Sequence, residues 1–164
     1  MASSFVPHEP LDALDSRLIG LMRTVPNLPV IEMARRLGVA RGTVQARLAR
    51  LHERGVIVGY GPDLSHSASG YAVLAFTTLE IAQGNDATII EGLAATPEVL
   101  EVHAVTGPGD LHCRIVARSN EHLHEIISRI LTLPGIDRTE THLVLGTPID
   151  RGLADVVGTP PEPG

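Results

Sequence analysis

The chain has 164 residues, of which 43% are hydrophobic, and its formal net charge at pH 7 is −6. This composition excludes a disordered chain, and the length is sufficient for two small domains. No apolar run approaches the roughly 18–20 residues that span a bilayer, the first residues lack the features of a signal peptide, and Cys113 is the only cysteine. We therefore expect a cytoplasmic protein without an internal disulfide and without membrane association.

The charge is distributed unevenly along the chain. Residues 1–60 hold eight arginines against five acidic residues, a charge of +3, whereas residues 61–164 hold five arginines against fourteen acidic residues, a charge of −9. A basic head joined to an acidic remainder is typical of a DNA-binding domain on a second domain, although a solvated charged helix face would look the same by charge alone. Because the chain has no tryptophan and few other aromatic residues, duplex DNA is a better target than single strands.

The first sixty residues predict three helices, each with apolar residues spaced three or four positions apart. Their expected ranges are 12–24, 30–37 and 41–54. Asp12 and Asp15 form a capping arrangement at the start of the first helix, and Gly38 stands where a left-handed residue would end the second. The buried side of the second helix is expected to hold Ile31, Ala34 and Leu37. Two short helices joined by a tight turn, behind a supporting helix, make a helix-turn-helix.

The third helix carries the surface expected to read DNA. At 100° per residue, the face opposite its apolar stripe holds small residues, which allow a close approach to base edges. Glutamine can pair with adenine, and arginine can reach guanine or phosphate. The residues predicted to contact DNA are Arg35, Arg36, Arg41, Gly42, Thr43, Gln45, Ala46, Arg47, Ala49 and Arg50. A plain three-helix core whose exposed face binds nothing is the alternative.

After the third helix, the β-branched residues 56–58 predict a small wing strand, and residues 61–70, rich in Gly and Ser, predict a linker. From residue 71 the pattern predicts strands and helices in the order β-α-β-β-α-β. Their expected ranges are 71–81, 86–95, 98–106, 111–118, 120–132 and 136–146. The expected fold class is therefore α+β: an N-terminal winged helix-turn-helix (1–60) followed by a ferredoxin-like βαββαβ domain (71–147). Residues 148–164 lack the apolar spacing that predicts strands and helices, and they are expected to be a partly disordered tail.

A sheet of this fold leaves one face uncovered by its own helices. In the first strand both alternating rows of side chains are largely apolar, so neither face of the sheet is suited to full exposure to solvent. We therefore expect the uncovered face to pack against a second copy, giving a homodimer.

The eight histidines raise a metal or haem hypothesis. No Cys-x-x-Cys or His-x-x-x-His pair occurs, and we expect no metal and no cofactor. Counting back from a turn at 106–110 places His103 opposite Cys113 and not opposite His112, so His103 with Cys113 is the one pairing to check.

Four segments together resemble the Lrp/AsnC, or feast/famine, family. They are LDALDSRLIGLM, EMARRLGVARGTVQARLARLHERGVIVGY, PEVLEVHAVTGPGD and LPGIDRTETHLVL, within residues 11–147. The resemblance implies a sequence-specific transcriptional regulator, not an enzyme, whose dimers assemble into tetramers, octamers or higher rings on double-stranded DNA. It also implies an amino acid or related small effector bound between dimers. The effector-binding residues expected from it are Thr106, Gly107, Pro108, Gly109 and Asp110.

The chain departs from the family pattern at two positions. Ala40 stands before the third helix where a serine is usual, and loss of such a cap costs on the order of 1 kcal/mol. Leu111 follows Asp110, where many members carry an aromatic residue beside the aspartate, so the resemblance does not extend to the effector's side-chain pocket.

The loop at 106–110 and the function of the whole chain each have alternative interpretations. Exposed N–H groups at Gly107 and Gly109 could hold a carboxylate and Asp110 an ammonium group, but Gly-Pro-Gly-Asp is also an ordinary hairpin turn. The alternatives for the whole chain are a sirohaem-decarboxylase-like enzyme of the same architecture, a regulator without a small effector, and a module whose helix-turn-helix contacts protein.

Overall fold

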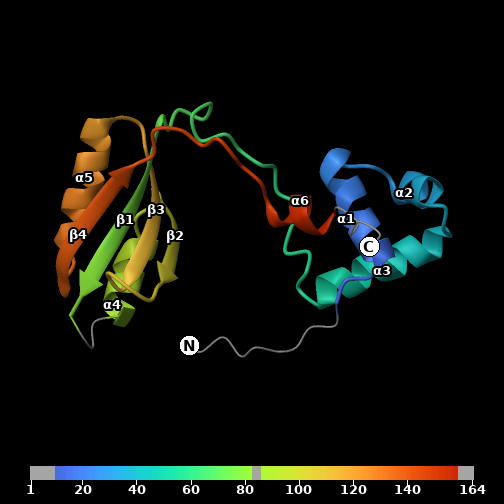
Figure 1. Ribbon diagram of the computed structural model, residues 1–164, viewed down its shortest axis with the longest axis horizontal. Coiled ribbons are helices and arrows are strands. Elements are labelled where there is room, and N and C mark those ends of the chain that lie inside the picture. The colour runs from blue at the N-terminus through green and yellow to red at the C-terminus, as the bar shows by residue number, and fades with distance from the viewer. Residues whose placement is uncertain (1–9, 83–85, 159–164) are drawn as a thin grey trace. The chain divides into compact units, whose positions relative to one another are not determined.

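The computed structural model describes residues 10–82 and 86–158, which form two compact units (Figure 1). The first unit, the head, contains the described residues up to Gly61 together with those from Pro148 onward. The second unit is Pro62–Thr147. Within the described residues, no helix is long and apolar enough to cross a membrane.

The head contains the three predicted helices, α1 (Ala13–Thr24), α2 (Val30–Leu37) and α3 (Arg41–Glu53). The predicted capping box at the start of α1 is confirmed, because Asp12 Oδ1 accepts the N–H groups of Leu14 and Asp15 at 2.9 and 2.8 Å. Gly38 ends α2 in the left-handed conformation, with φ 71°. As expected, Ala40 provides no side-chain cap for α3. The core between the helices is built mainly from Leu18, Met33, Leu37, Val44 and Leu51.

Two expectations for the head are wrong. Ile31 is 67% exposed, because the inward row of α2 consists of Met33, Ala34 and Leu37 and Ile31 lies off that row. Residues 56–58 form no wing strand; the N–H groups of Val56 and Ile57 donate to the Leu51 carbonyl at 2.9 and 3.2 Å. These bonds close the end of α3, so the described head is a helix-turn-helix without a wing.

The second unit has the predicted βαββαβ order. Its elements are β1 (Val73–Ile81), α4 (Asp86–Ala94), β2 (Val99–Ala104), β3 (Leu111–Ala117), α5 (Asn120–Leu131) and β4 (Ile136–Leu143). The sheet has the order β2-β3-β1-β4 with antiparallel pairing throughout, and this confirms the ferredoxin-like topology.

The two faces of the sheet differ in what covers them. The inward row, which includes Ala75, Leu79 and Ile115, packs against apolar side chains of α4 and α5. The outer row of β1 holds Leu74, Phe76 and Thr78, which are only half-buried. Alternation along the strand therefore gives the sheet one face that its own helices do not cover.

The hairpin register differs from the one predicted. His103 lies opposite His112, and Cys113 lies opposite Val102. The Val105 N–H donates to the Asp110 carbonyl at 3.0 Å, so the turn spans 106–109 and is one residue shorter than the sequence suggests. The pairing of His103 with Cys113 is therefore wrong, because a shift of one residue exchanges the faces.

Cys113 lies in the core beneath α4 and α5, where burial raises the pKa of its thiol to about 11. The described residues contain no group of three or more His, Cys, Asp or Glu side chains that could hold a metal ion.

The C-terminal segment returns to the head as a short helix, α6 (Leu153–Val157). Ala154 and Val157 pack against the head core, and Arg23 Nε of α1 donates to Asp155 Oδ1 at 3.1 Å. The sequence does not predict this helix, because five residues are too few to show a helical period. Residues 159–164 lie outside the described part of the chain.

Candidate DNA-binding surface and effector loop

The outward face of α3 has the composition predicted for a surface that reads DNA. Val44 and Leu51 are fully buried, and the residues opposite them are exposed. These exposed residues are Gly42, Thr43, Gln45, Ala46 and Ala49. Arg41, the first residue of the helix, is exposed as well and pairs with no carboxylate among the described residues. A glutamine amide and a guanidinium therefore flank a face that is otherwise almost free of bulky side chains.

Arg35 and Arg36, at the end of α2, share one carboxylate. Arg35 donates to Glu32 Oε2 through Nε (2.8 Å) and to Oε1 through Nη2 (2.7 Å), and Arg36 Nε donates to Oε1 at 3.0 Å. The hydrogen bonds from Arg35 and then Arg36 lower the pKa of Glu32 to about 2. Both arginines remain largely exposed, so this end of α2 keeps a net positive charge toward solvent.

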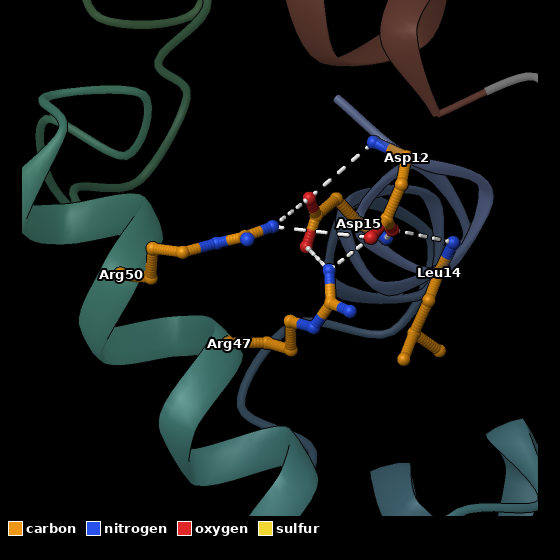
Figure 2. Close-up of polar contacts among 5 residues, drawn as sticks. All are labelled: Asp12, Leu14, Asp15, Arg47 and Arg50. Carbon is orange, nitrogen blue, oxygen red and sulfur yellow. Dashed lines mark hydrogen bonds and ion pairs between the residues drawn. The ribbon is translucent and has the colours of Figure 1, made fainter. Parts of the chain in front are cut away.

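Arg47 and Arg50 point toward the N-terminal turn of α1 (Figure 2). Arg47 Nη1 donates to Asp15 Oδ1 at 3.1 Å and also to Asp12 Oδ2. Arg50 Nη2 donates to Asp15 Oδ2 at 2.7 Å and lies 3.9 Å from Asp12 Oδ2. The structure thus pairs Arg47 and Arg50, both predicted to contact DNA, with Asp12 and Asp15 at the start of the first helix.

The sequence assigns these two acids to capping and does not reveal their second partners. Asp12 and Asp15 are three positions apart on α1, and Arg47 and Arg50 are three positions apart on α3. Equal spacing of opposite charges on two helices is a signal that could have suggested the cluster. The Asp15 N–H, and then the Arg47 guanidinium, hold the pKa of Asp12 below its usual range.

His52 is a further residue that the sequence does not single out. It is exposed near the end of α3, seven positions after Gln45, and so lies on the same flank as Gln45. Its ring nitrogens lie 3.1 Å from the Ile57 carbonyl oxygen and 2.6 Å from the Tyr60 hydroxyl. The segment after α3 is therefore held against the helix by His52 instead of by a wing.

The predicted effector loop lies against the end of β1. Asp110 Oδ2 accepts the Ile81 N–H at 2.8 Å, and the Asp110 N–H donates to the Leu79 carbonyl at 2.8 Å. Gly109 has φ 80°, and a Cβ atom there would collide with the Thr78 side chain. Gly109 and Asp110 thus have structural roles, as the plain-turn reading requires.

At the tip of the loop, a Cβ atom on Gly107 would meet nothing within 4 Å, although the positive φ there favours glycine. Thr106, Gly107 and Pro108 are exposed, and Gly107 has φ 106°. This arrangement leaves the backbone at the tip of the loop open to a partner or ligand.

An exposed helix face of small residues beside arginines, on a helix-turn-helix joined to a ferredoxin-like domain, defines a two-domain DNA-binding protein. Residues 11–52 match the AsnC-type helix-turn-helix domain, and residues 74–154 match the Lrp/AsnC ligand binding domain. The chain belongs to the Lrp/AsnC family of transcriptional regulators. It carries that family's DNA-binding and ligand-binding domains.

Proteins that are similar to most of this chain are also named as transcriptional regulators. The HTH-type transcriptional regulator FL11 of Pyrococcus horikoshii is 31% identical over 84% of this chain and 91% of its own length. An uncharacterised HTH-type transcriptional regulator of Pyrococcus abyssi is 32% identical over 82% of this chain and 92% of its own. These relatives are named as regulators and not as enzymes.

Solved structures show the same architecture. The structure of E. coli AsnC superposes with a TM-score of 0.83 at 27% identity, covering 89% of this chain and 99% of that one. The regulator NMB0573 of Neisseria meningitidis, solved as a complex with L-Met, superposes with a TM-score of 0.75 at 23% identity, covering 88% of this chain and 96% of that one. The second likeness shows the fold.

Proposed function

We propose that this regulator binds specific duplex DNA sequences through the exposed face of α3, and that a small effector of the amino-acid class modulates its DNA binding or assembly. The observation that carries the proposal is the exposed face of Gly42, Ala46 and Ala49, flanked by Gln45 and Arg41. Small side chains let the helix enter a major groove deeply enough for the glutamine amide to reach a base edge. In a dimer, two such helices would occupy successive major grooves.

Contacts to the phosphate backbone come from the arginines around this face. We assign Arg41, with Arg35 and Arg36 at the end of α2, to phosphate contacts, because all three guanidinium groups are exposed. Such contacts position the head and carry no base preference of their own.

Selection of duplexes from a random library on the intact protein tests the DNA-binding proposal. Gln45→Ala should relax the preference at one base position in each half-site, because a bidentate glutamine–adenine pair contributes about 1–3 kcal/mol of discrimination. Glu125→Ala, on the exposed side of α5, is the matched control and should select the same sequence as the unchanged protein. An identical preference for Gln45→Ala would remove this residue from the base-reading set.

Three observations support an effector site at the loop 106–110. The second unit matches a ligand binding domain, a structural neighbour was solved with L-Met, and the tip of the loop is exposed. Asp110 Oδ2 is occupied by the Ile81 N–H, so we assign the other carboxylate oxygen to the effector's ammonium group. We place this site between dimers, as the family resemblance implies.

A thermal-shift screen of amino acids on the intact protein identifies the effector, and Asp110→Asn tests the site. Asparagine keeps an oxygen that accepts the Ile81 N–H but removes the negative charge, so the fold should persist while the ligand-induced shift is lost. Asp137→Asn, another exposed aspartate of the same unit, should retain the shift. A shift retained by Asp110→Asn would place the effector elsewhere.

We also propose that two copies associate through the uncovered face of the sheet. Leu74 and Phe76 lie in the middle of that face, and Phe76 stacks on His112 with ring centroids 5.4 Å apart. Opposite charges surround them, including the Arg114–Glu101 pair at 3.1 Å. An apolar centre with a paired charged rim suits a self-complementary contact about a two-fold axis.

A further inference from the structure

We infer that Asp15 is a positioning residue for α3, and that its buried carboxylate withholds Arg47 and Arg50 from the DNA phosphates. The inference rests on the proposed DNA-binding function. It replaces the prediction that Arg47 and Arg50 contact DNA. It concerns the cluster of Asp12, Asp15, Arg47 and Arg50 (Figure 2).

The burial of Asp15 is the first step. Its side chain is 0% exposed, whereas those of Arg47 and Arg50 are 27% and 36% exposed. An ionised carboxylate without water needs paired cations and hydrogen bonds. Asp15 obtains them from Arg47 Nη1, from Arg50 Nη2 and, at 3.4 Å, from the Asp12 N–H. Both arginines are therefore required by a group that cannot turn to solvent.

The direction of the two arginines on α3 is the second step. At 100° per residue, Arg47 and Arg50 lie on one flank of the helix, and Gln45 lies on the other, with the small residues between them. The flank that carries Arg47 and Arg50 is bound to the first turn of α1. The ion pairs thus fix the rotation of α3 about its own axis and thereby aim Gln45 and the small residues outward.

Competition between Asp15 and DNA is the third step. For Arg47 or Arg50 to contact a phosphate, it would have to leave Asp15, and the buried charge would lose a partner. Removing one partner of a buried ion pair is strongly unfavourable, whereas a phosphate contact in water is screened by salt. The exchange is unfavourable overall, so Arg47 and Arg50 stay with α1 when DNA binds.

Two variants that each remove one negative charge from the head test the inference. Glu53→Gln removes an exposed charge at the end of α3, and Asp15→Asn removes the buried one. By Coulomb's law alone, both should strengthen binding to a polyanion. If Asp15 positions α3, Asp15→Asn should instead weaken binding on the order of tenfold, while Glu53→Gln binds as well as the unchanged protein or better.

The salt dependence of binding tests the arginines separately. The probe is a fluorescent duplex of about 30 base pairs selected by the unchanged protein, long enough for two half-sites. Each lost phosphate contact lowers the slope of log Kd against log salt by about 0.9. Arg47→Gln and Arg50→Gln should keep the slope of the unchanged protein and melt at lower temperature. Arg41→Gln, whose exposed side chain we assign to a phosphate, removes one contact from each of the two heads on the duplex and should lower the slope by about 1.8.

The outcomes separate the inference from the function on which it rests. If the unchanged protein enriches no duplex from the library, the proposed DNA binding is wrong. If it binds DNA but Asp15→Asn tightens binding, Asp15 does not position α3, and if Arg47→Gln and Arg50→Gln each lower the slope, both arginines contact phosphates. Either result overturns the inference. Binding is measured well below each variant's melting temperature, and the two arginine variants decide the question alone if Asp15→Asn does not fold.

Discussion

The carboxylate of Asp12 makes two kinds of contact, one within its own helix turn and one to another helix. Its Oδ1 accepts N–H groups of the first turn of α1, and its Oδ2 accepts from Arg47 of α3. The first contact starts a helix, and the second joins that helix to its neighbour. A single side chain therefore links local helix formation to the packing that aims α3.

The pH dependence of stability should reveal what the charge of Asp12 contributes through the Asp15 N–H and the Arg47 guanidinium. The pKa of Asp12 is lowered in the folded head from its ordinary 3.8, so its charge stabilises the fold above pH 3.8 and this stabilisation is lost as pH falls through the lower, folded value. Asp12→Asn keeps a good helix cap but has no charge for Arg47. The unchanged protein should therefore melt higher than Asp12→Asn at neutral pH, and the gap should close below about pH 4.

Thermal melts followed by circular dichroism across this range provide the measurement. Asp137→Asn, which removes an exposed carboxylate from the other unit, is the control and should show no such closing gap. A constant difference between the unchanged protein and Asp12→Asn at every pH would show that the charge of Asp12 does not contribute to stability.

At the scale of elements, α6 shows how a short segment can be ordered by a distant one. The LADVV segment is too short to form a helix alone, since isolated helices of this length are unstable in water. It is held by packing on α1, where Gly20 and Gly158 bring two backbones together. The chain therefore leaves the head after α3 and returns to it at α6.

Substitution of Gly20 should report the docking of α6. Alanine in the interior of α1 would ordinarily stabilise the head by about 0.5–1 kcal/mol. A Cβ atom on Gly20 would, however, lie 2.6 Å from the Gly158 carbonyl oxygen, so α6 must move. Gly20→Ala should therefore fail to raise the melting temperature of the full chain but raise that of a chain ending at Asp150.

Gly42→Ala is the control for this prediction, because a Cβ atom on Gly42 meets nothing within 4 Å. It should have the same effect in both chains. If Gly20→Ala stabilises the full chain as much as the shortened one, α6 is not packed on α1 in solution.

At the scale of the whole molecule, the uncovered sheet face decides how copies associate. Phe76 lies in its centre, with Arg114 and His142 as cross-strand neighbours. Phe76→Glu places a charge in the proposed dimer contact, yet these basic neighbours allow the charge in a single chain. We expect the folded variant to sediment as a monomer under conditions in which the unchanged protein is a dimer.

Leu131→Glu is the matched control, since Leu131 is an exposed apolar residue on α5, outside the proposed contact. It should leave the assembly unchanged. Sedimentation of Phe76→Glu at the same mass as the unchanged protein would exclude this face as the dimer contact.

The order and type of the elements follow from local patterns in the sequence. Apolar spacing, Asp12 and Gly38 define the helices of the head, and alternating β-branched segments define the sheet, because these signals act between residues close in the chain. The outward residues of α3 follow from the same helical period. The family resemblance, which rests on four short segments, was likewise readable from the chain and is confirmed by the comparisons.

Some of the errors and omissions depend on the exact geometry of a turn or a helix end, and others on contacts between residues far apart in the chain. The register that sets His103 against His112 depends on where the hairpin closes, the missing wing on bonds to Leu51, and the helix at 153–157 on packing against α1. The pairing of Asp15 with Arg47 and Arg50 spans more than thirty positions. Helical spacing places these arginines beside the reading face, but only the packed head shows that a buried carboxylate holds them.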